Sequence, residues 1–173
     1  MTQRQTEAVQ CTNKTSEKHM TEDVITITLA TDPSHAGWLA FRQQLYTGVD
    51  RQFHLTDMEL NVTAAERDCL LAVDADEAMC GMLELSLRNI VDGCLSGPVG
   101  YIEGVYVAES HRGLELSRRL LDAGKEWCSQ RGCTEIATDS ELYDVTAQQF
   151  HLSMGFEETC RVVEFRKALT SPE

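Results

Sequence analysis

The chain has 173 residues, of which 42% are hydrophobic, and its formal net charge is −13. This length is typical of a single domain, and the hydrophobic fraction is sufficient for a core. The negative charge argues against nonspecific nucleic-acid binding, because phosphates would be repelled, and suits a cationic partner or substrate. A generally acidic soluble protein would carry the same charge. The sequence has no apolar run as long as a membrane span and no signal-peptide core, so we expect a cytoplasmic protein without nucleic-acid or membrane partners.

The cysteines and histidines do not form a metal-site pattern. There are 7 cysteines, an odd number, and no two have C-x-x-C spacing. This argues against a disulfide framework or a zinc site. Four cysteines lie in or beside apolar runs and are predicted to be small buried side chains: Cys69, Cys80, Cys128 and Cys133. The 5 histidines show no ligand spacing, and no metal is predicted.

The N-terminal region is polar and then becomes periodic. Residues 1–22 have no apolar period, which predicts a mobile extension, and one domain is expected over residues 23–170. Alternation of apolar residues with threonine predicts that the domain begins with a strand over 24–30.

Two helices are expected next. Asp32 is the predicted N-cap of the first, with Pro33 in its first turn and Tyr46 near its end. Thr56 and Glu59 stand in capping-box register, which predicts a second, short helix that begins there.

The centre of the chain is rich in strand patterns. Residues 69–74 and 78–88 are predicted to form a hairpin around the turn "DADEA". Residues 89–98 are rich in turn formers and predict a loop, which leads to a strand over 99–107 with Glu103 inside it.

The C-terminal third alternates between helix and strand. A helix is predicted over 114–132, a strand over 133–139, a helix over 144–154 and a last strand over 158–169. The first of these helices is expected to turn to the core Leu116, Leu120, Leu121, Ala123, Gly124 and Trp127. The element order predicts an α+β fold with a mixed, mainly antiparallel sheet flanked by helices.

One strand–loop–helix unit has the character of an anion site. The strand over 99–107 runs into "AESHRG" and then into a helix. Free backbone N–H groups in such a loop and the helix N-terminus can together hold a pyrophosphate. Arg112, Arg118 and Arg119 add positive charge nearby. The pattern alone is not specific, because it is more often only a connection.

A second motif makes the pattern specific. The stretch "FHLSMGFEE" follows on the next predicted helix, and together with the loop it resembles the GNAT N-acetyltransferase superfamily. The blocks "WLAFRQQLY", "GPVGYIEGVYVAESHR" and "FHLSMGFEET" are similar, in order, to aminoglycoside 6′-N-acetyltransferases. The resemblance covers most of residues 24–169. It implies the GNAT fold, acetyl-CoA as co-substrate, a cationic amino-sugar acceptor, antibiotic resistance and a homodimer.

The resemblance also assigns residues to acetyl-CoA. The strand that pairs with the pantetheine arm corresponds to Val105, Tyr106 and Val107. The pyrophosphate loop corresponds to Arg112, Gly113, Leu114, Glu115, Leu116, Ser117 and Arg118. Asp144 stands where the family has an Asn that touches the cofactor. Glu115 replaces a glycine, and either repels the pyrophosphate or caps the helix and points outward.

On the acceptor side the resemblance implies two central acids, Glu103 and Asp139, which would hold ammonium groups through charge-assisted hydrogen bonds. The family's flanking contacts are replaced by Tyr46, Ile90 and Cys160. The acceptor is therefore expected to bind weakly, to bind in another pose, or to be a different amine. Glu84 either joins these acids or faces water on its alternating strand.

Three residues are catalytic candidates by the same resemblance. Glu103, or alternatively Asp139, would accept the amine proton through water, and Tyr106 or His151 would donate to the leaving thiolate. Two alternatives to the aminoglycoside activity stay open. One is a GNAT enzyme for another small amine or a peptide N-terminus; the other, which Glu115 favours, is a non-catalytic GNAT-fold binding protein.

Overall fold

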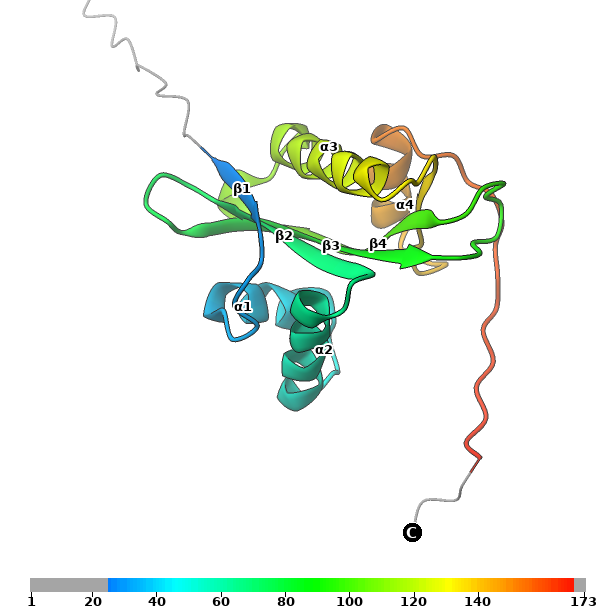
Figure 1. Cartoon of the computed structure of the whole chain (residues 1–173), viewed down its shortest axis with the longest axis horizontal. Helices are drawn as coiled ribbons and strands as arrows, with labels where there is room; N and C mark the ends of the chain where they lie inside the picture. The colour runs from blue at the N-terminus through cyan, green and yellow to red at the C-terminus, as the bar shows by residue number, and fades with distance from the viewer. Residues whose placement is uncertain (1–24, 170–173) are drawn as a thin grey trace, which may run out of the picture.

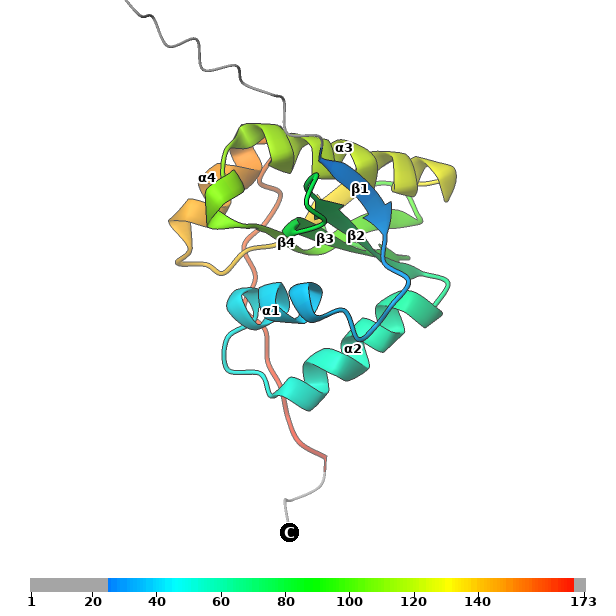
Figure 2. The same ribbon diagram turned by 90° about the vertical axis from the view of Figure 1, so that its left-hand side faces the viewer.

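A computed structural model describes residues 25–169, in which a five-stranded sheet of order β1-β2-β3-β4-β5 lies between two layers of helices. Helices α1 (Ala36–Leu45) and α2 (Arg51–Thr63) cover one face, and α3 (Leu114–Gln130) and α4 (Val145–Ser153) cover the other (Figures 1 and 2). This confirms the predicted α+β fold. The predicted mobile extension, residues 1–22, lies outside the described residues.

The first helix begins later than predicted. Asp32 does not cap it, because the Oδ1 atom of Asp32 accepts hydrogen bonds from the backbone N–H and the hydroxyl of Ser34, at 2.8 and 2.6 Å. This local turn delays the helix, and His35 becomes the N-cap, with Nδ1 3.3 Å from the backbone nitrogen of Trp38. A short polar side chain that bonds to its own neighbour competes with helix initiation in this way.

The second helix begins earlier than predicted. Asp50 is its N-cap and accepts a 2.8 Å hydrogen bond from the backbone N–H of Phe53. Thr56 and Glu59 therefore lie inside α2, and the predicted capping box is wrong. Asp50 is as good an N-cap residue as Thr56 and lies more than one turn before it, so α2 is longer than predicted.

The central strands form antiparallel pairs, and a bulge interrupts one of them. β1 (Thr26–Leu29) pairs with β2 (Arg67–Val73), which forms the predicted hairpin with β3 (Met79–Arg88). β3 pairs in turn with β4 (Val99–Val107), where Glu103 has no partner because its neighbours in β4 pair with consecutive residues of β3. Such an extra residue bends the strand and re-aims its side chain.

α3 and α4 form within their predicted ranges, whereas β5 has three residues and is shorter than the strand predicted over 133–139. β5 (Ile136–Thr138) pairs in parallel with β4. α3 follows a short 3₁₀ turn at Glu109–His111 and buries its apolar stripe, in which Leu116, Leu120, Leu121 and Trp127 are each less than 6% exposed. Three of the four cysteines predicted to be buried are fully buried, and Cys133 packs against the core as a partly buried side chain.

The prediction of a last strand over residues 158–169 is wrong. Residues 158–169 contain no strand and run away from the body of the domain as an extended segment (Figure 1). Their apolar side chains lie open, and Phe165 is 94% exposed. A strand needs a neighbour for its backbone N–H and C=O groups, and no strand of residues 25–169 pairs with this segment.

Candidate active site

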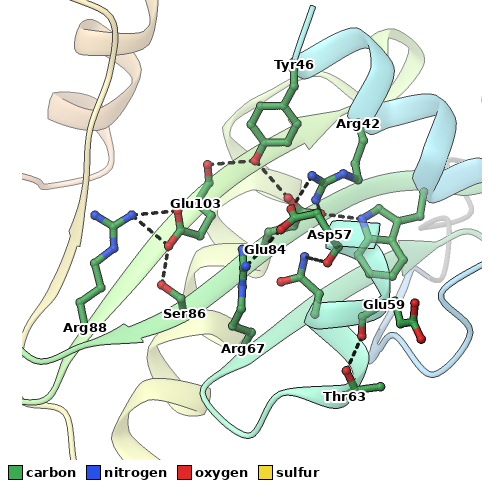
Figure 3. A network of polar contacts seen from close by, with 12 residues as sticks. Arg42, Tyr46, Asp57, Glu59, Thr63, Arg67, Glu84, Ser86, Arg88 and Glu103 are labelled. Carbon is green, nitrogen blue, oxygen red and sulfur yellow. Dashed lines mark hydrogen bonds and ion pairs between the residues drawn. The ribbon is translucent and has the colours of Figure 1, made fainter. Parts of the chain in front are cut away.

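A buried ion-pair network joins α1 and α2 to the sheet (Figure 3). Glu84, which is 1% exposed, accepts hydrogen bonds from Trp38 Nε1 at 2.7 Å and Tyr46 Oη at 3.0 Å, and pairs with Arg42. Arg42 also pairs with Asp57 at 2.6 Å. A buried carboxylate persists only when it is compensated in this way. Glu84 therefore does not face water; it lies beneath the acceptor-side residues, neutralised by Arg42.

Tyr46 crosses the bulged part of β4. Its hydroxyl donates to the backbone carbonyl of Glu103 at 2.9 Å, in addition to its contact with Glu84. A Cβ atom at Gly104 would lie 2.1 Å from this hydroxyl, so glycine is required there. Burial and the nearby carboxylate raise the pKa of Tyr46 far above its usual value. Tyr46 is thus a permanent hydrogen-bond donor that holds the bulge.

The two predicted central acids come together on the same face as Glu84. The carboxylate of Glu103 accepts from Ser86 Oγ at 2.5 Å and from Arg88 Nη2 at 2.9 and 3.0 Å (Figure 3). The guanidinium of Arg88 lies 3.3 Å from the centroid of the Tyr101 ring. The Tyr101 hydroxyl donates to Asp139 Oδ1 at 2.5 Å. We call these five residues the acid cluster.

Arg88 and Tyr101 were missed by the reasoning from sequence. Alternation along β3 could have found Arg88, since it lies two residues after Ser86 and must share its face. Tyr101 is found only from the register, which pairs it with Ser86 across β3 and β4. The consequence is electrostatic, because the predicted pair of acids is in fact partly neutralised by an arginine.

The remaining predicted acceptor residues are not anchored to the acid cluster. Ile90 is 85% exposed in the loop after β3, and Cys160 is exposed in the segment after α4. The two segments touch, since Thr159 Oγ1 donates to the carbonyl of Asp92 at 3.4 Å. The structure thus unites Tyr46 with the two acids and leaves Ile90 and Cys160 at the periphery.

The sheet opens beside the acid cluster. β4 and β5 pair only from Gly100 to Ile102 of β4, and no strand of residues 25–169 pairs with that edge of β4 further on. The N–H of Ala108 donates to Cys80 on β3 at 2.9 Å, so alternation directs the N–H groups of Val105 and Val107 to the open edge. An extended ligand chain could pair with this edge as an added strand would.

Tyr106 lies between these two valines and faces the other way. Its side chain packs on Phe41, with ring centroids 4.8 Å apart, and its hydroxyl donates to Gln44 at 2.5 Å. Both partners belong to α1. By the same alternation the backbone N–H of Tyr106 points to β3 and not to the open edge. Its side chain lies on the α1 side of the sheet.

An apolar slot lies on the opposite face, between the open edge, α3 and α4. Its enclosed volume is about 10 Å³, room for one water molecule, and about 240 Å³ is reached only when the open mouth is counted. It is lined by Leu83, Ile102, Val105, Ser117, Leu121, Phe150, His151, Met154 and Phe156. Apolar walls with few polar groups are typical of a site for a small organic ligand.

His151 is the titratable group in this slot. Its ring meets those of Phe150 and Phe156 edge to face, at 5.4 and 5.7 Å, and its buried Nδ1 has no partner among residues 25–169. Burial lowers the pKa of His151 below its usual value of 6.5, and the charges of Asp139 and Asp144 only partly oppose this effect. The imidazole is therefore neutral at neutral pH, and its Nδ1 is buried and unpaired within residues 25–169.

The predicted pyrophosphate loop ends at a helix N-terminus without a side-chain cap. Gly113 is the N-cap, with φ of 156°, and has no side chain to accept from the first N–H groups of α3. Arg112 is exposed beside it, and Arg118 Nη2 donates to the carbonyl of Ser153 at 3.4 Å. Glu115 is exposed in the first turn. These features fit an anion held by backbone N–H groups.

Four other predicted cofactor residues differ in what they can offer to a ligand. Leu114 is the first residue of α3, and Leu116 is 3% exposed in the core, so Leu116 can offer a ligand only its backbone. Ser117 lines the slot. Asp144 is the N-cap of α4 and accepts from the N–H of Ala147 at 2.9 Å, so its carboxylate has a structural partner.

Residues 25–169 lack the features of two other kinds of site. In that part of the chain no helix is long and apolar enough to cross a membrane. The same residues contain no group of three or more His, Cys, Asp or Glu side chains that could hold a metal ion.

Comparison with known proteins agrees with this geometry. The model of the Acetyltransferase (GNAT) family matches residues 35–156. An aminoglycoside N(6′)-acetyltransferase type 1 of Stenotrophomonas maltophilia is 39% identical over 83% of this chain and 94% of its own. The crystal structure of the aminoglycoside antibiotic 6′-N-acetyltransferase AAC(6′)-Ih from Acinetobacter baumannii superposes with a TM-score of 0.79, at 32% identity, over 85% of this chain and all of that one.

A second solved structure is as similar. AAC(6′)-Iy in complex with the bisubstrate analog CoA-S-monomethyl-acetylneamine has a TM-score of 0.78 at 32% identity, over 84% of this chain and 99% of that one. The chain belongs to the GNAT acetyltransferase family, on its aminoglycoside N(6′)-acetyltransferase branch. This confirms the resemblance seen in the sequence.

Proposed function

We propose that this protein transfers an acetyl group from acetyl-CoA to the 6′-amino group of aminoglycosides. The observation that carries the proposal is the opening between β4 and β5, which has an apolar slot on one face and the acid cluster on the other. One side suits a thioester and the other a cation. Acetylation removes a positive charge from the drug, and the activity would confer antibiotic resistance.

The residues present fit acetyl-CoA as co-substrate. We infer that the N–H groups of Val105 and Val107 pair with its pantetheine arm along the open edge of β4. The uncapped N-terminus of α3, with Arg112 and Arg118 beside it, would hold the pyrophosphate. The apolar slot would exclude water from the thioester end. Asp144 and Tyr106 have their own partners and would contribute little.

The acceptor would lie on the α1 side of the sheet. Glu103 and Asp139 would hold its ammonium groups, since charge-assisted hydrogen bonds are the strong ones. The reacting amine must be neutral to attack, so its proton must first leave. Glu103 lies in the bulge beside the open edge, and we propose that it accepts this proton through a water molecule.

Two groups would stabilise the reacting atoms. The N–H of Val105 points to the open edge and would polarise the thioester carbonyl as an oxyanion donor. His151 lines the slot in its neutral form, and its ring N–H would donate a hydrogen bond to the leaving sulfur. Of the two candidates for this role, we propose His151, because Tyr106 lies on the opposite face.

We also propose a cytoplasmic homodimer. The segment 158–169 has the alternation of a strand, with Val163, Phe165 and Leu169 on one side, exposed by 73%, 94% and 96%. A second copy of the chain would supply the strand partner that residues 25–169 do not offer. The cytoplasm is the expected location because the activity needs acetyl-CoA, which is made and used there.

A narrower acceptor range is the second candidate function. It is favoured by Ile90 and Cys160, which stand at family contact positions but lie on exposed segments away from the acid cluster. Calorimetry with acetyl-CoA, followed by assay of thiol release with kanamycin and tobramycin, separates the possibilities. Failure to bind acetyl-CoA would contradict any acetyltransferase role. Binding without aminoglycoside-dependent thiol release would favour another amine.

A further inference from the structure

The ion pair between Arg88 and Glu103 lies where a substrate ammonium group is expected. Arg88 Nη2 contacts both oxygens of the Glu103 carboxylate, at 2.9 and 3.0 Å. Within residues 25–169 this is the one ion pair of Arg88, whose guanidinium otherwise rests on the Tyr101 ring. The protein's own cation thus occupies the negative group that should attract the substrate.

This pair differs from the other arginine pair of the network in its access to solvent. The Arg42 side chain is 3% exposed between Glu84 and Asp57, and both of its acids hold it in place. The Arg88 side chain is 41% exposed and the Glu103 side chain 24%. Partly exposed pairs are weakly held, because water and other ions compete for both partners. Arg88 can therefore leave Glu103 without unfolding the site.

Asp139 offers the complementary contact. Within residues 25–169 its carboxylate accepts from the hydroxyl of Tyr101, a neutral donor, and forms no ion pair, and Asp139 is exposed. Its negative charge is therefore not cancelled by a cation, unlike that of Glu103. A first ammonium group can bind Asp139 at once, whereas a second must compete with Arg88 for Glu103.

We propose that Arg88 is a specificity-determining residue that occupies the ammonium position of Glu103 in the free enzyme and is displaced by multiply charged acceptors. This inference rests on the proposed function. In the free enzyme Arg88 limits repulsion between Glu103 and Asp139. During binding it lowers the affinity for acceptors that use Glu103 and does not affect those that use Asp139 alone. After displacement the long side chain swings to solvent from its place on Tyr101.

The test compares Arg88→Gln and Arg88→Met with the wild type on two acceptors. One is kanamycin, which carries several amines; the other is 6-amino-6-deoxyglucose, whose reacting amine is its sole amine. We expect KM for kanamycin to fall about fivefold, which corresponds to about 1 kcal/mol. KM for the single-amine sugar should not change. An unchanged or higher KM for kanamycin, or an equal fall for both acceptors, would overturn the proposal.

Arg131→Gln is the matched control. Arg131 also stacks on an aromatic ring, that of Trp127 at 4.0 Å, and pairs with a carboxylate, Asp68 at 3.0 Å. It belongs to the end of α3, away from the acid cluster, so its loss should leave both KM values unchanged. Thermal unfolding of each variant confirms that the fold is retained. If the Gln variant of Arg88 unfolds, the Met variant still tests the charge.

A double-mutant cycle tests whether Arg88 acts through Glu103. In an E103Q background, R88Q should leave the Kd of kanamycin unchanged when binding is measured by calorimetry without turnover. A change of Kd in that background would overturn the mechanism. The underlying activity is tested separately with the wild-type enzyme. Thiol release that does not depend on kanamycin would contradict the proposed function, and this result is distinct from any effect of Arg88.

Discussion

The hydroxyl of Tyr46 lies over Gly104, where a Cβ atom would be only 2.1 Å away, and it binds the carbonyl of the neighbouring Glu103. This contact joins α1 to the bulge of β4. It sets the position of the Glu103 side chain, which carries both the proposed acceptor contact and the proposed proton path. The absence of a side chain at Gly104 is therefore part of the acceptor site.

Gly104→Ala tests this relationship. The added methyl group cannot fit unless Tyr46 moves, and overpacking of this kind costs about 1–3 kcal/mol. We expect a lower free energy of unfolding and a higher KM for the acceptor, with the Kd of CoA little changed. Urea unfolding and steady-state kinetics measure both effects. Tyr46→Phe should partly rescue Gly104→Ala by removal of the clashing hydroxyl; equal damage in the double variant would contradict the steric explanation.

The second prediction concerns the pH dependence of turnover. Burial lowers the pKa of His151 below 6.5, and the proposed donor is the neutral ring. Activity should therefore be complete above pH 6.5 and fall as the pH drops through the lowered pKa. His151→Gln should reduce kcat about 100-fold, the scale of one proton-transfer or hydrogen-bonding group, and remove this acid limb.

His35→Asn is the control for the histidine variant. His35 caps α1, and Asn keeps an acceptor at that position, so stability and the acid limb should both persist. A full kcat in His151→Gln would exclude His151 from the reaction. An acid limb above pH 6.5 would show that another group is responsible.

The third prediction addresses the carboxylate at the proposed pyrophosphate site. Glu115 is exposed in the first turn of α3, where it is attracted by the helix dipole and repelled by a bound phosphate. We expect Glu115→Gln to tighten CoA binding, because it removes the charge that repels the phosphate. The gain should be only a few fold, since solvent reduces this repulsion to about 1 kcal/mol. Glu126→Gln, on the same helix but far from its N-terminus, is the control. Equal CoA affinity in the wild type and in both variants would mean that Glu115 points away from the ligand.

The fourth prediction concerns assembly. If the segment 158–169 pairs with a second copy, Phe165→Asp should convert a dimer into a monomer, as measured by light scattering on a sizing column. The control is Phe53→Asp, which places a charge at another exposed phenylalanine, 59% exposed on α2. A wild-type monomer, or dissociation by the control alone, would contradict the proposed role of this segment.

Most of the fold was predictable from local sequence patterns, because alternation and helical periodicity report which side chains face a core. The apolar stripe of α3 was predicted residue by residue. Helix starts were less predictable, because two short polar residues can compete for one cap, as Asp32 and His35 do before α1. The last strand failed for a different reason, since no strand of residues 25–169 pairs with this segment.

The sequence by itself determined the family and predicted the cofactor loop and the two central acids, since these depend on residue type and spacing along single elements. The tertiary structure alone decided their electrostatic state. Strand register brought Arg88 to Glu103 and Tyr101 to Asp139. Strand alternation put Tyr106 and Val105 on opposite faces, and the packing of α4 placed His151 on the Val105 side. Register and cross-sheet packing join residues that are distant in the chain, and the charge of a carboxylate depends on such neighbours.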